Sequence, residues 1–208
     1  MENQQGVWDA IAASKRSQEN EYTLHRKHEQ PVVQEFLKGK TGKLLDLGCG
    51  TGRNFIYSPL LSWYCIDFSE KMLKHASINA GAKNIEAEFF HAEAHDLDFN
   101  DNFFDNILCY SVLHCIEGDK REKTIKEIYR VLRSGGQALI SVWSRNSPRL
   151  KNKNKECYVA WGVSKTEKKL RYTYIYEFGE IKELLEKTGF KILSSDENMN
   201  LDFIVEKP

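Results

Sequence analysis

Three glycines at alternate positions directly follow a short apolar segment. Residues 43–47 include Asp46, and Gly48, Gly50 and Gly52 come after them. Glycine lets the backbone turn tightly and approach a ligand where a Cβ would collide, and open α/β sheets bind ligands at the carboxyl ends of their strands. A dinucleotide site uses the spacing G-x-G-x-x-G, so this alternation fits a pyrophosphate-bound dinucleotide less well. The alternative is that the glycines serve only a tight turn.

A second acidic residue ends the next apolar segment. Asp67 closes residues 63–67 and lies 21 positions after Asp46. A carboxylate at the end of a neighbouring strand can accept hydrogen bonds from both hydroxyl groups of a ribose. The two segments together therefore predict a binding site for a nucleoside-containing ligand.

The elements that position these residues alternate between strand and helix patterns at intervals of about 20 to 30 residues, which is typical of βα units around a parallel sheet. We therefore expect an open α/β fold, and the length of 208 residues predicts a single domain over 1–208. Strands are expected at 43–47, 63–67, 85–90, 104–110, 137–143, 190–194 and 201–205, and helices at 31–37, 70–79, 120–132 and 179–188.

Composition excludes several classes of protein. Hydrophobic residues make up 41% and charged residues 29% of the chain, which argues against disorder and coiled coils. The sequence has no apolar run long enough to span a membrane and a polar amino-terminal stretch, so we expect a cytoplasmic protein. Five scattered cysteines without C-x-x-C spacing predict reduced thiols rather than a disulfide framework or a zinc site. His91, Glu93 and His95 do not share a helix face, so no metal is predicted.

Charge is balanced overall but uneven along the chain. Residues 144–171 hold nine basic and two acidic side chains, although the whole chain has 30 of each. We expect a basic insertion at about 145–171, with a flexible stretch at 145–155. Such a run suits contacts with phosphate groups, and the alternative is a solvated loop.

Four motifs in order resemble the class I S-adenosylmethionine-dependent methyltransferases. The resemblance runs through residues 44–52, 66–73, 103–107 and 130–136. It implies a Rossmann-like, open and mostly parallel seven-stranded sheet with helices on both faces, and S-adenosyl-L-methionine as the cofactor. In that family the glycine loop packs on the methionine part, the acidic residue after the second strand holds the ribose, and a pair after the third strand borders the adenine. The implied cofactor-binding residues are Asp46, Gly48, Gly50, Gly52, Asp67, Phe68, Glu93, Ala94 and Ser111.

The flanks are similar to one subfamily, the tRNA wobble-uridine methyltransferases that esterify a carboxymethyl group in the anticodon loop. Matching pieces lie at 7–12, 111–114, 138–144, 159–161 and 171–174. The resemblance implies tRNA as the substrate. The implied RNA-binding residues are Arg145, Arg149, Lys151, Lys153, Arg171 and Tyr172.

The acceptor chemistry is compatible with these residues. A carboxylate is already ionised at neutral pH, so methyl transfer to it needs alignment and exclusion of water rather than a strong base. Arg26 is the candidate for holding the carboxylate or a nearby phosphate, and His114 and Trp143 follow strand ends where the acceptor should enter. Trp143 or Tyr172 could stack on a uridine. The structural alternatives are a hydrogen-bonded His114 and a Trp143 that only closes the core.

The third expected strand lies at an edge of such a sheet, and Ile85, Phe89 and Phe90 make it apolar. An uncovered apolar edge is an aggregation hazard. The resemblance implies a small zinc-binding activator subunit that continues the sheet at 85–90, with the zinc in the partner; self-association through this edge is the alternative. Two other functions stay open, a small-molecule O- or N-methyltransferase and a non-catalytic cofactor-binding scaffold.

Overall fold

The computed structural model describes residues 3–14, 31–148, 150–164 and 166–208. Two of the predicted site residues, Arg26 and Arg149, lie outside the described residues.

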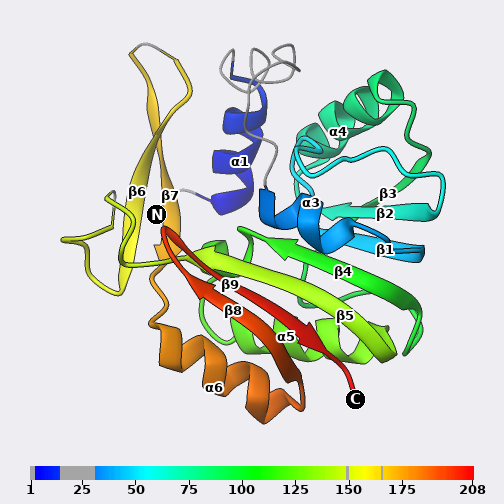
Figure 1. Ribbon diagram of the computed structural model, residues 1–208. Helices are drawn as coiled ribbons and strands as arrows, with labels where there is room; N and C mark the ends of the chain where they lie inside the picture. The colour runs from blue at the N-terminus through cyan, green and yellow to red at the C-terminus, as the bar shows by residue number, and fades with distance from the viewer. Residues whose placement is uncertain (1–2, 15–30, 149, 165) are drawn as a thin grey trace.

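A seven-stranded sheet forms the centre of the protein (Figure 1), with the strand order β3-β2-β1-β4-β5-β9-β8. Neighbouring strands among the first five run parallel, β9 runs antiparallel to β5, and β8 runs antiparallel to β9. This arrangement confirms the expected open, mostly parallel sheet. The strands are β1 (Gly42–Leu47), β2 (Leu61–Asp67), β3 (Ala87–His91), β4 (Phe104–Tyr110), β5 (Leu132–Trp143), β8 (Lys191–Glu197) and β9 (Asn200–Glu206).

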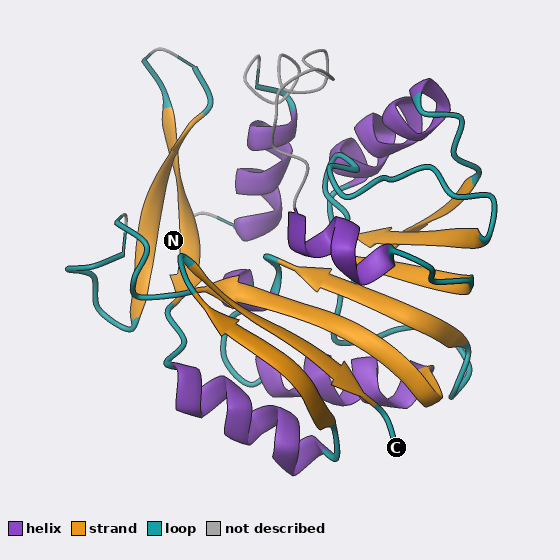
Figure 2. Cartoon of the chain, in the orientation of Figure 1, coloured by secondary structure: helices purple, strands orange, loops and turns teal. Residues whose placement is uncertain are grey.

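Helices cover both faces of the sheet (Figure 2). On one face, α3 (Pro31–Leu37) and α4 (Glu70–Ala82) pack their apolar sides on β1, β2 and β4. On the other face, α5 (Lys120–Val131) and α6 (Phe178–Thr188) pack on β4, β5 and β9. A single 3₁₀ turn, η1 (Leu113–Cys115), follows β4. Because the central strands β1 and β4 are covered on both sides, their buried residues are continuous, whereas β9 alternates and β8 is mostly exposed.

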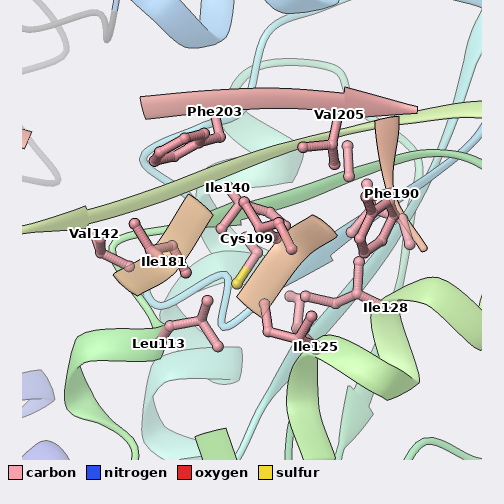
Figure 3. Close-up of a cluster of buried hydrophobic side chains, with 14 of the residues drawn as sticks. Cys109, Leu113, Ile125, Ile128, Ile140, Val142, Ile181, Phe190, Phe203 and Val205 are labelled. Carbon is pink, nitrogen blue, oxygen red and sulfur yellow. The ribbon is translucent and has the colours of Figure 1, made fainter. Parts of the chain in front are cut away.

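The larger apolar cluster lies between the sheet and the helices α5 and α6 (Figure 3). Ile125 and Ile128 are three positions apart on α5, so they lie on one helix face, and both are fully buried. Ile181 from α6 and Phe203 from β9 complete the same cluster. Burial of side chains of this size contributes about 1.5 to 3 kcal/mol each, so this layer fixes the sheet on which the site is built.

The expected elements are present, with shifted boundaries. The largest shift is in β5, which begins at Leu132 rather than at 137. Its first residues include Gly135 and Gly136, where the Gly135 N–H donates to the Lys207 carbonyl and the Gly136 carbonyl accepts from the Lys207 N–H. Pairing with Lys207 therefore holds both glycines within β5, although Gly135 has a left-handed φ of 71°.

One helix and one pair of strands had no counterpart among the predicted helices and strands. The helix is α1 (Gln4–Ala12), and the antiparallel strands are β6 (Glu156–Gly162) and β7 (Lys168–Tyr174). The basic insertion expected at 145–171 therefore contains an ordered hairpin. Figure 1 shows α1 between this hairpin and α4, and α1 contacts both β7 and α4. Among the described residues, no helix has the length and apolar character that a membrane span requires.

Candidate active site

A cavity of about 690 Å³ lies at the carboxyl ends of the central strands and is covered by α1. Its volume is typical of a site for a nucleotide-sized ligand. Residues from α1, from the loops after β1, β2, β3 and β4, and from the β6–β7 hairpin all line it. The structure brings ten of the predicted site residues into this lining: Gly48, Gly50, Asp67, Phe68, Glu93, Ala94, Ser111, His114, Trp143 and Arg171.

The glycine loop passes close to neighbouring groups. Gly48 has a φ of 71°, and a Cβ on it would lie 2.5 Å from Cγ2 of Val112. Gly50 has a φ of 55°, and its N–H donates to Oδ2 of Asp67 at 2.9 Å. Left-handed backbone favours glycine at both positions, and at Gly48 the close approach of Val112 adds to this preference. The loop is thereby joined to the end of β2.

Asp67 is held in place from two sides. Its Oδ2 accepts from Gly50 and its Oδ1 accepts from the Ser69 N–H at 2.9 Å. Burial raises the pKa of Asp67 to about 6, although both hydrogen bonds favour the charged form. A carboxylate fixed at a strand end, with lone pairs left over, suits the two hydroxyl groups of a ribose. Ser69 also caps α4, and its hydroxyl donates to Asp9 of α1 at 2.5 Å.

Asp46 lies in β1, away from the cavity lining, and is fully buried. Its Oδ1 accepts from the Asn54 amide at 3.1 Å, while Oδ2 has no hydrogen-bond partner among the described residues. Burial raises the pKa of Asp46 to about 7, and the neighbouring Asp67 adds to the rise. Gly52 also lies outside the lining, and a Cβ there would meet the ring of Phe55 at 2.3 Å.

Three tryptophans surround a buried cation at the other end of the cavity. The Arg171 guanidinium carbon lies 4.3 Å from the ring centre of Trp143, 4.7 Å from Trp161 and 5.3 Å from Trp8. Only 4% of Arg171 is exposed. Aromatic faces attract cations, and the attraction strengthens where water is excluded. We call these four residues the tryptophan–arginine cluster.

His114 in η1 lies next to this cluster and is fully buried. Its ring stacks on Trp143 with ring centres 4.8 Å apart. The backbone N–H of Trp143 donates to Nδ1 of His114 at 3.3 Å. The ring hydrogen of neutral His114 therefore belongs on Nε2. Burial, together with the nearby Arg171, holds the pKa of His114 well below its ordinary value. Nε2 has no partner among the described residues, so a neutral N–H donor is available to a ligand.

Other predicted residues lie elsewhere. Tyr172 is buried outside the cavity, where its hydroxyl accepts from Arg121 at 2.7 Å. Arg145 forms an ion pair with Glu177 at 2.9 Å. Lys151 and Lys153 are exposed on the segment before β6 and do not line the cavity.

Sequence reasoning assigned no site role to several residues that line the cavity, namely Trp8, Tyr110, Tyr158, Trp161 and Asn200. Trp8 and Trp161 lie in segments 7–12 and 159–161, which carry the resemblance to the tRNA methyltransferases. This resemblance was the one signal in the sequence that these two residues could belong to the site. Their association could not be predicted, because they are distant in the sequence and meet only through the docking of α1 against the hairpin.

A family model for a methyltransferase domain matches residues 45–140, from β1 to β5. The match contains the glycine loop, Asp67 and η1. A candidate methyltransferase of Encephalitozoon cuniculi is 28% identical over 199 residues, which cover 90% of each chain.

Two relatives are named as tRNA (carboxymethyluridine(34)-5-O)-methyltransferases. The protein from Schizosaccharomyces pombe is 29% identical over 78% of this chain and 80% of its own length. The protein from Arabidopsis thaliana is 30% identical over 66% of this chain, but the aligned part spans only 32% of that longer protein.

Solved structures share the fold. An S-adenosylmethionine-dependent methyltransferase from Clostridium acetobutylicum superimposes with a TM-score of 0.71 at 16% identity, covering 92% of this chain and 97% of the other. A chain from the complex between the Haloferax volcanii Trm112 methyltransferase activator and a candidate methyltransferase superimposes with a TM-score of 0.73 at 16% identity, covering 97% of both chains.

Residues 45–140 match a methyltransferase domain, and the strand order and the cavity resemble those expected of the class I S-adenosylmethionine-dependent methyltransferases. The site fits this cofactor, because Gly48 and Gly50 line the cavity and the Asp67 carboxylate beside them is fixed at the end of β2 with lone pairs left for a ribose. Within that class, the chain resembles the tRNA carboxymethyluridine methyltransferases.

Proposed function

We propose that this protein methylates the carboxylate of a carboxymethyl group on the wobble uridine, position 34, of a tRNA anticodon loop. The observation that carries the proposal is the tryptophan–arginine cluster beside neutral His114. Small-molecule acceptors and a non-catalytic scaffold are the competing functions.

The charges at the acceptor end suit a carboxylate. A buried guanidinium stabilises an anion through charge-assisted hydrogen bonds, and it has donors for two oxygens. The Nε2–H of His114 adds a neutral donor. We assign the acceptor carboxylate to Arg171 and His114, with Arg26, which lies outside the described residues, as the third candidate.

The aromatic rings give this end of the site its second property. Trp8, Trp143 and Trp161 offer flat apolar surfaces next to the cation, and unstacked uridines bind proteins by such stacking. The rings and α1 also exclude water. Bound S-adenosylmethionine supplies a methyl group on a sulfonium, so aligning the acceptor and keeping water out is the work left to this chain.

The cofactor end follows from the same geometry. We assign the ribose to Asp67, the methionine part to the loop of Gly48 and Gly50, and the adenine to the region of Glu93 and Ala94. Both ends open into one cavity, as transfer of a methyl group from the bound cofactor to an acceptor would require.

RNA binding rests on weaker but separate support. Lys151, Lys153 and Lys168 are exposed near or on the hairpin, where phosphates of a bound RNA could reach them. The names of the relatives from S. pombe and A. thaliana point to the same substrate class.

The test is mass spectrometry of tRNA nucleosides after incubation with labelled S-adenosylmethionine. We expect label in the methyl ester of carboxymethyluridine and none in tRNA that lacks the carboxymethyl group. Arg171→Gln should lower methyl transfer at least about tenfold with unchanged cofactor affinity, while Lys187→Gln on the exposed face of α6 serves as the matched control. Transfer to free carboxylic acids but not to tRNA would overturn the tRNA proposal. Cofactor binding without transfer to any acceptor would support the scaffold.

We also propose that an activator subunit covers β3. This strand spans Ala87–His91, slightly later than the expected 85–90, and it forms one edge of the sheet. Phe89 and Phe90 are half-buried on it, and no described strand pairs with its outer side. Peptide groups on such an edge can bind a strand from a partner. The Trm112 complex among the structural neighbours makes a small zinc-binding activator the leading candidate.

Purification with and without that subunit tests this second proposal. We expect the chain alone to associate or precipitate, and the pair to be monodisperse and more active. A chain that is monomeric, monodisperse and fully active alone would refute both the activator and the self-association alternative.

A further inference from the structure

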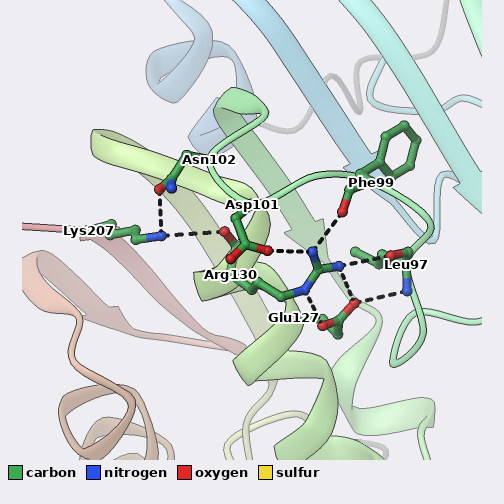
Figure 4. Close-up of polar contacts among 7 residues, drawn as sticks. All are labelled: Leu97, Phe99, Asp101, Asn102, Glu127, Arg130 and Lys207. Atoms are coloured by element: carbon green, nitrogen blue, oxygen red, sulfur yellow. Dashed lines mark hydrogen bonds and ion pairs between the residues drawn. The ribbon is translucent and has the colours of Figure 1, made fainter.

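The loop between β3 and β4, residues 92–103, has two halves with different surroundings. Its first half carries Glu93 and Ala94, which line the cavity. Its second half runs beside α5 and makes most of its polar contacts there (Figure 4). The position of the cavity wall therefore depends on how the second half is held.

Arg130 of α5 holds that half through its backbone. The Nη2 group donates to the Leu97 carbonyl at 2.8 Å, and Nη1 donates to the Phe99 carbonyl at 2.7 Å. Nη1 also donates to Oδ1 of Asp101 at 2.9 Å. One guanidinium thus contacts three positions within five residues of the loop.

Glu127, one turn earlier on α5, fixes the orientation of the guanidinium. Its two carboxylate oxygens accept from Nε and Nη2 of Arg130 at 2.7 and 2.8 Å. The same carboxylate accepts from the Leu97 N–H at 2.9 Å. Both the N–H and the carbonyl of Leu97 are therefore bound by the Arg130–Glu127 pair.

The end of the loop is also fixed to α5. The Asn102 N–H donates to the Arg130 carbonyl at 3.0 Å, and Lys207 donates to Oδ1 of Asn102 at 2.8 Å. The Phe99 ring packs edge-on against Phe104 with centres 4.9 Å apart, so the aromatic core fixes that side chain. Replacing the Arg130 side chain leaves the packing of the Phe99 ring and the backbone contact of Asn102 in place. The carbonyls of Leu97 and Phe99, however, lose the guanidinium N–H groups that donate to them.

We propose that Arg130 is a positioning residue for the cofactor, acting through Glu127 and the loop on the wall formed by Glu93 and Ala94. A loop that is ordered before binding spares the ligand the entropic cost of ordering it. Without the guanidinium, the loop must be ordered when the cofactor binds, and the entropic cost of this ordering lowers the affinity for the cofactor. The residues that line the cavity are unchanged. Lysine supplies one point charge instead of a planar set of donors and replaces the function only in part.

Calorimetric titration with S-adenosylhomocysteine tests this role in Arg130→Gln and Arg130→Lys. The matched control is Arg133→Gln, which removes an ion pair of similar length to Asp105, 2.6 Å, away from the loop. We expect the dissociation constant to rise at least about tenfold in Arg130→Gln, less in Arg130→Lys, and at most about twofold in the control. Unchanged affinity in folded Arg130→Gln would overturn the proposal, as would an equal loss in the control.

Two further measurements separate positioning from general destabilisation. Hydrogen exchange of residues 92–103 should become faster in Arg130→Gln, while exchange in α4 stays unchanged. In turnover assays, KM for the cofactor should rise, while kcat at saturating cofactor stays near that of the parent. If Arg130→Gln does not fold, Asp101→Ala removes one exposed acceptor of the same guanidinium. We expect a rise of about threefold in the dissociation constant there, and no change would overturn the proposal.

Discussion

The Asp46→Asn variant should be more stable than the parent protein above neutral pH. Asp46 is fully buried, it accepts only from Asn54 among the described residues, and the carboxylate of Asp67 lies near it. Asparagine has nearly the same shape and carries no charge. Its carbonyl oxygen can keep the hydrogen bond from Asn54.

The magnitude follows from proton linkage. Burial raises the pKa of Asp46 from the ordinary 3.8 to about 7 in the folded protein. Since a tenfold change in proton affinity corresponds to about 1.36 kcal/mol, ionising Asp46 in the folded state costs about 4 kcal/mol relative to the unfolded chain. The folded state binds the proton more tightly, so this group makes stability fall as pH rises from about 4 to about 7.

Asparagine removes this penalty but buries an amide group in place of Oδ2. An unsatisfied buried polar group costs about 1 to 3 kcal/mol, so we expect a net gain of about 1 to 3 kcal/mol at pH 8.5. For a chain of this size, that corresponds to an increase of roughly 2 to 10 °C in Tm. At pH 4.5, where Asp46 is protonated, the variant should be equal to the parent or less stable.

Urea unfolding of cofactor-free protein at pH 4.5 and 8.5 measures the difference. Asn54→Ala is a useful companion, because it removes the only described donor to Asp46 and should destabilise the protein at pH 8.5. An Asp46→Asn variant that is destabilised by the same amount at both pH values would refute the reasoning. That outcome would mean that Asp46 is ionised at no cost.

Other predictions concern ligand binding and backbone strain. Asp67→Ala should weaken S-adenosylmethionine binding by roughly 2 to 4 kcal/mol in calorimetry, and unchanged affinity would remove Asp67 from the ribose site. Because the pKa values of Asp46 and Asp67 are raised to about 7 and about 6, affinity for the cationic cofactor should fall as pH decreases from 8 to 5, and a flat profile would contradict this. His114→Ala and Trp143→Ala should each lower methyl transfer at least about tenfold at constant cofactor affinity; normal turnover in both would place the acceptor elsewhere. Ser111 has a φ of 64°, so Ser111→Gly should raise stability by about 1 kcal/mol, whereas a lower Tm would show that its side chain matters more than the strain.

The cofactor half of the site could be predicted because its signals are local. The loop of Gly48 and Gly50 directly follows β1, and Asp67 ends β2, so strand identity and spacing placed them at one edge of the sheet. Parallel strands with adjacent positions in the order bring such ends together without further information. Asp46 was grouped with the contacting residues, but the pleat directs it away from the cavity lining.

The acceptor half could be predicted only in part. Arg171 was interpreted as one of many basic residues suited to phosphate, yet it is buried among tryptophans. Its role depends on β7 pairing with β6 and on α1 packing against the hairpin, and the second of these contacts joins segments that are far apart in the sequence. The many basic residues in 144–171 predict a positively charged surface, but they do not show which of these side chains is buried.

Helix α1 touches both halves of the site at once. Asp9 accepts from Ser69, whose N–H donates to Asp67, while Gln4 accepts from the Tyr172 N–H and Trp8 lies against Arg171. A displacement of α1 therefore breaks contacts at the cofactor end and at the acceptor end together. In kinetic terms, we expect a ligand that holds α1 in place at one end to lengthen the residence time of a ligand at the other end.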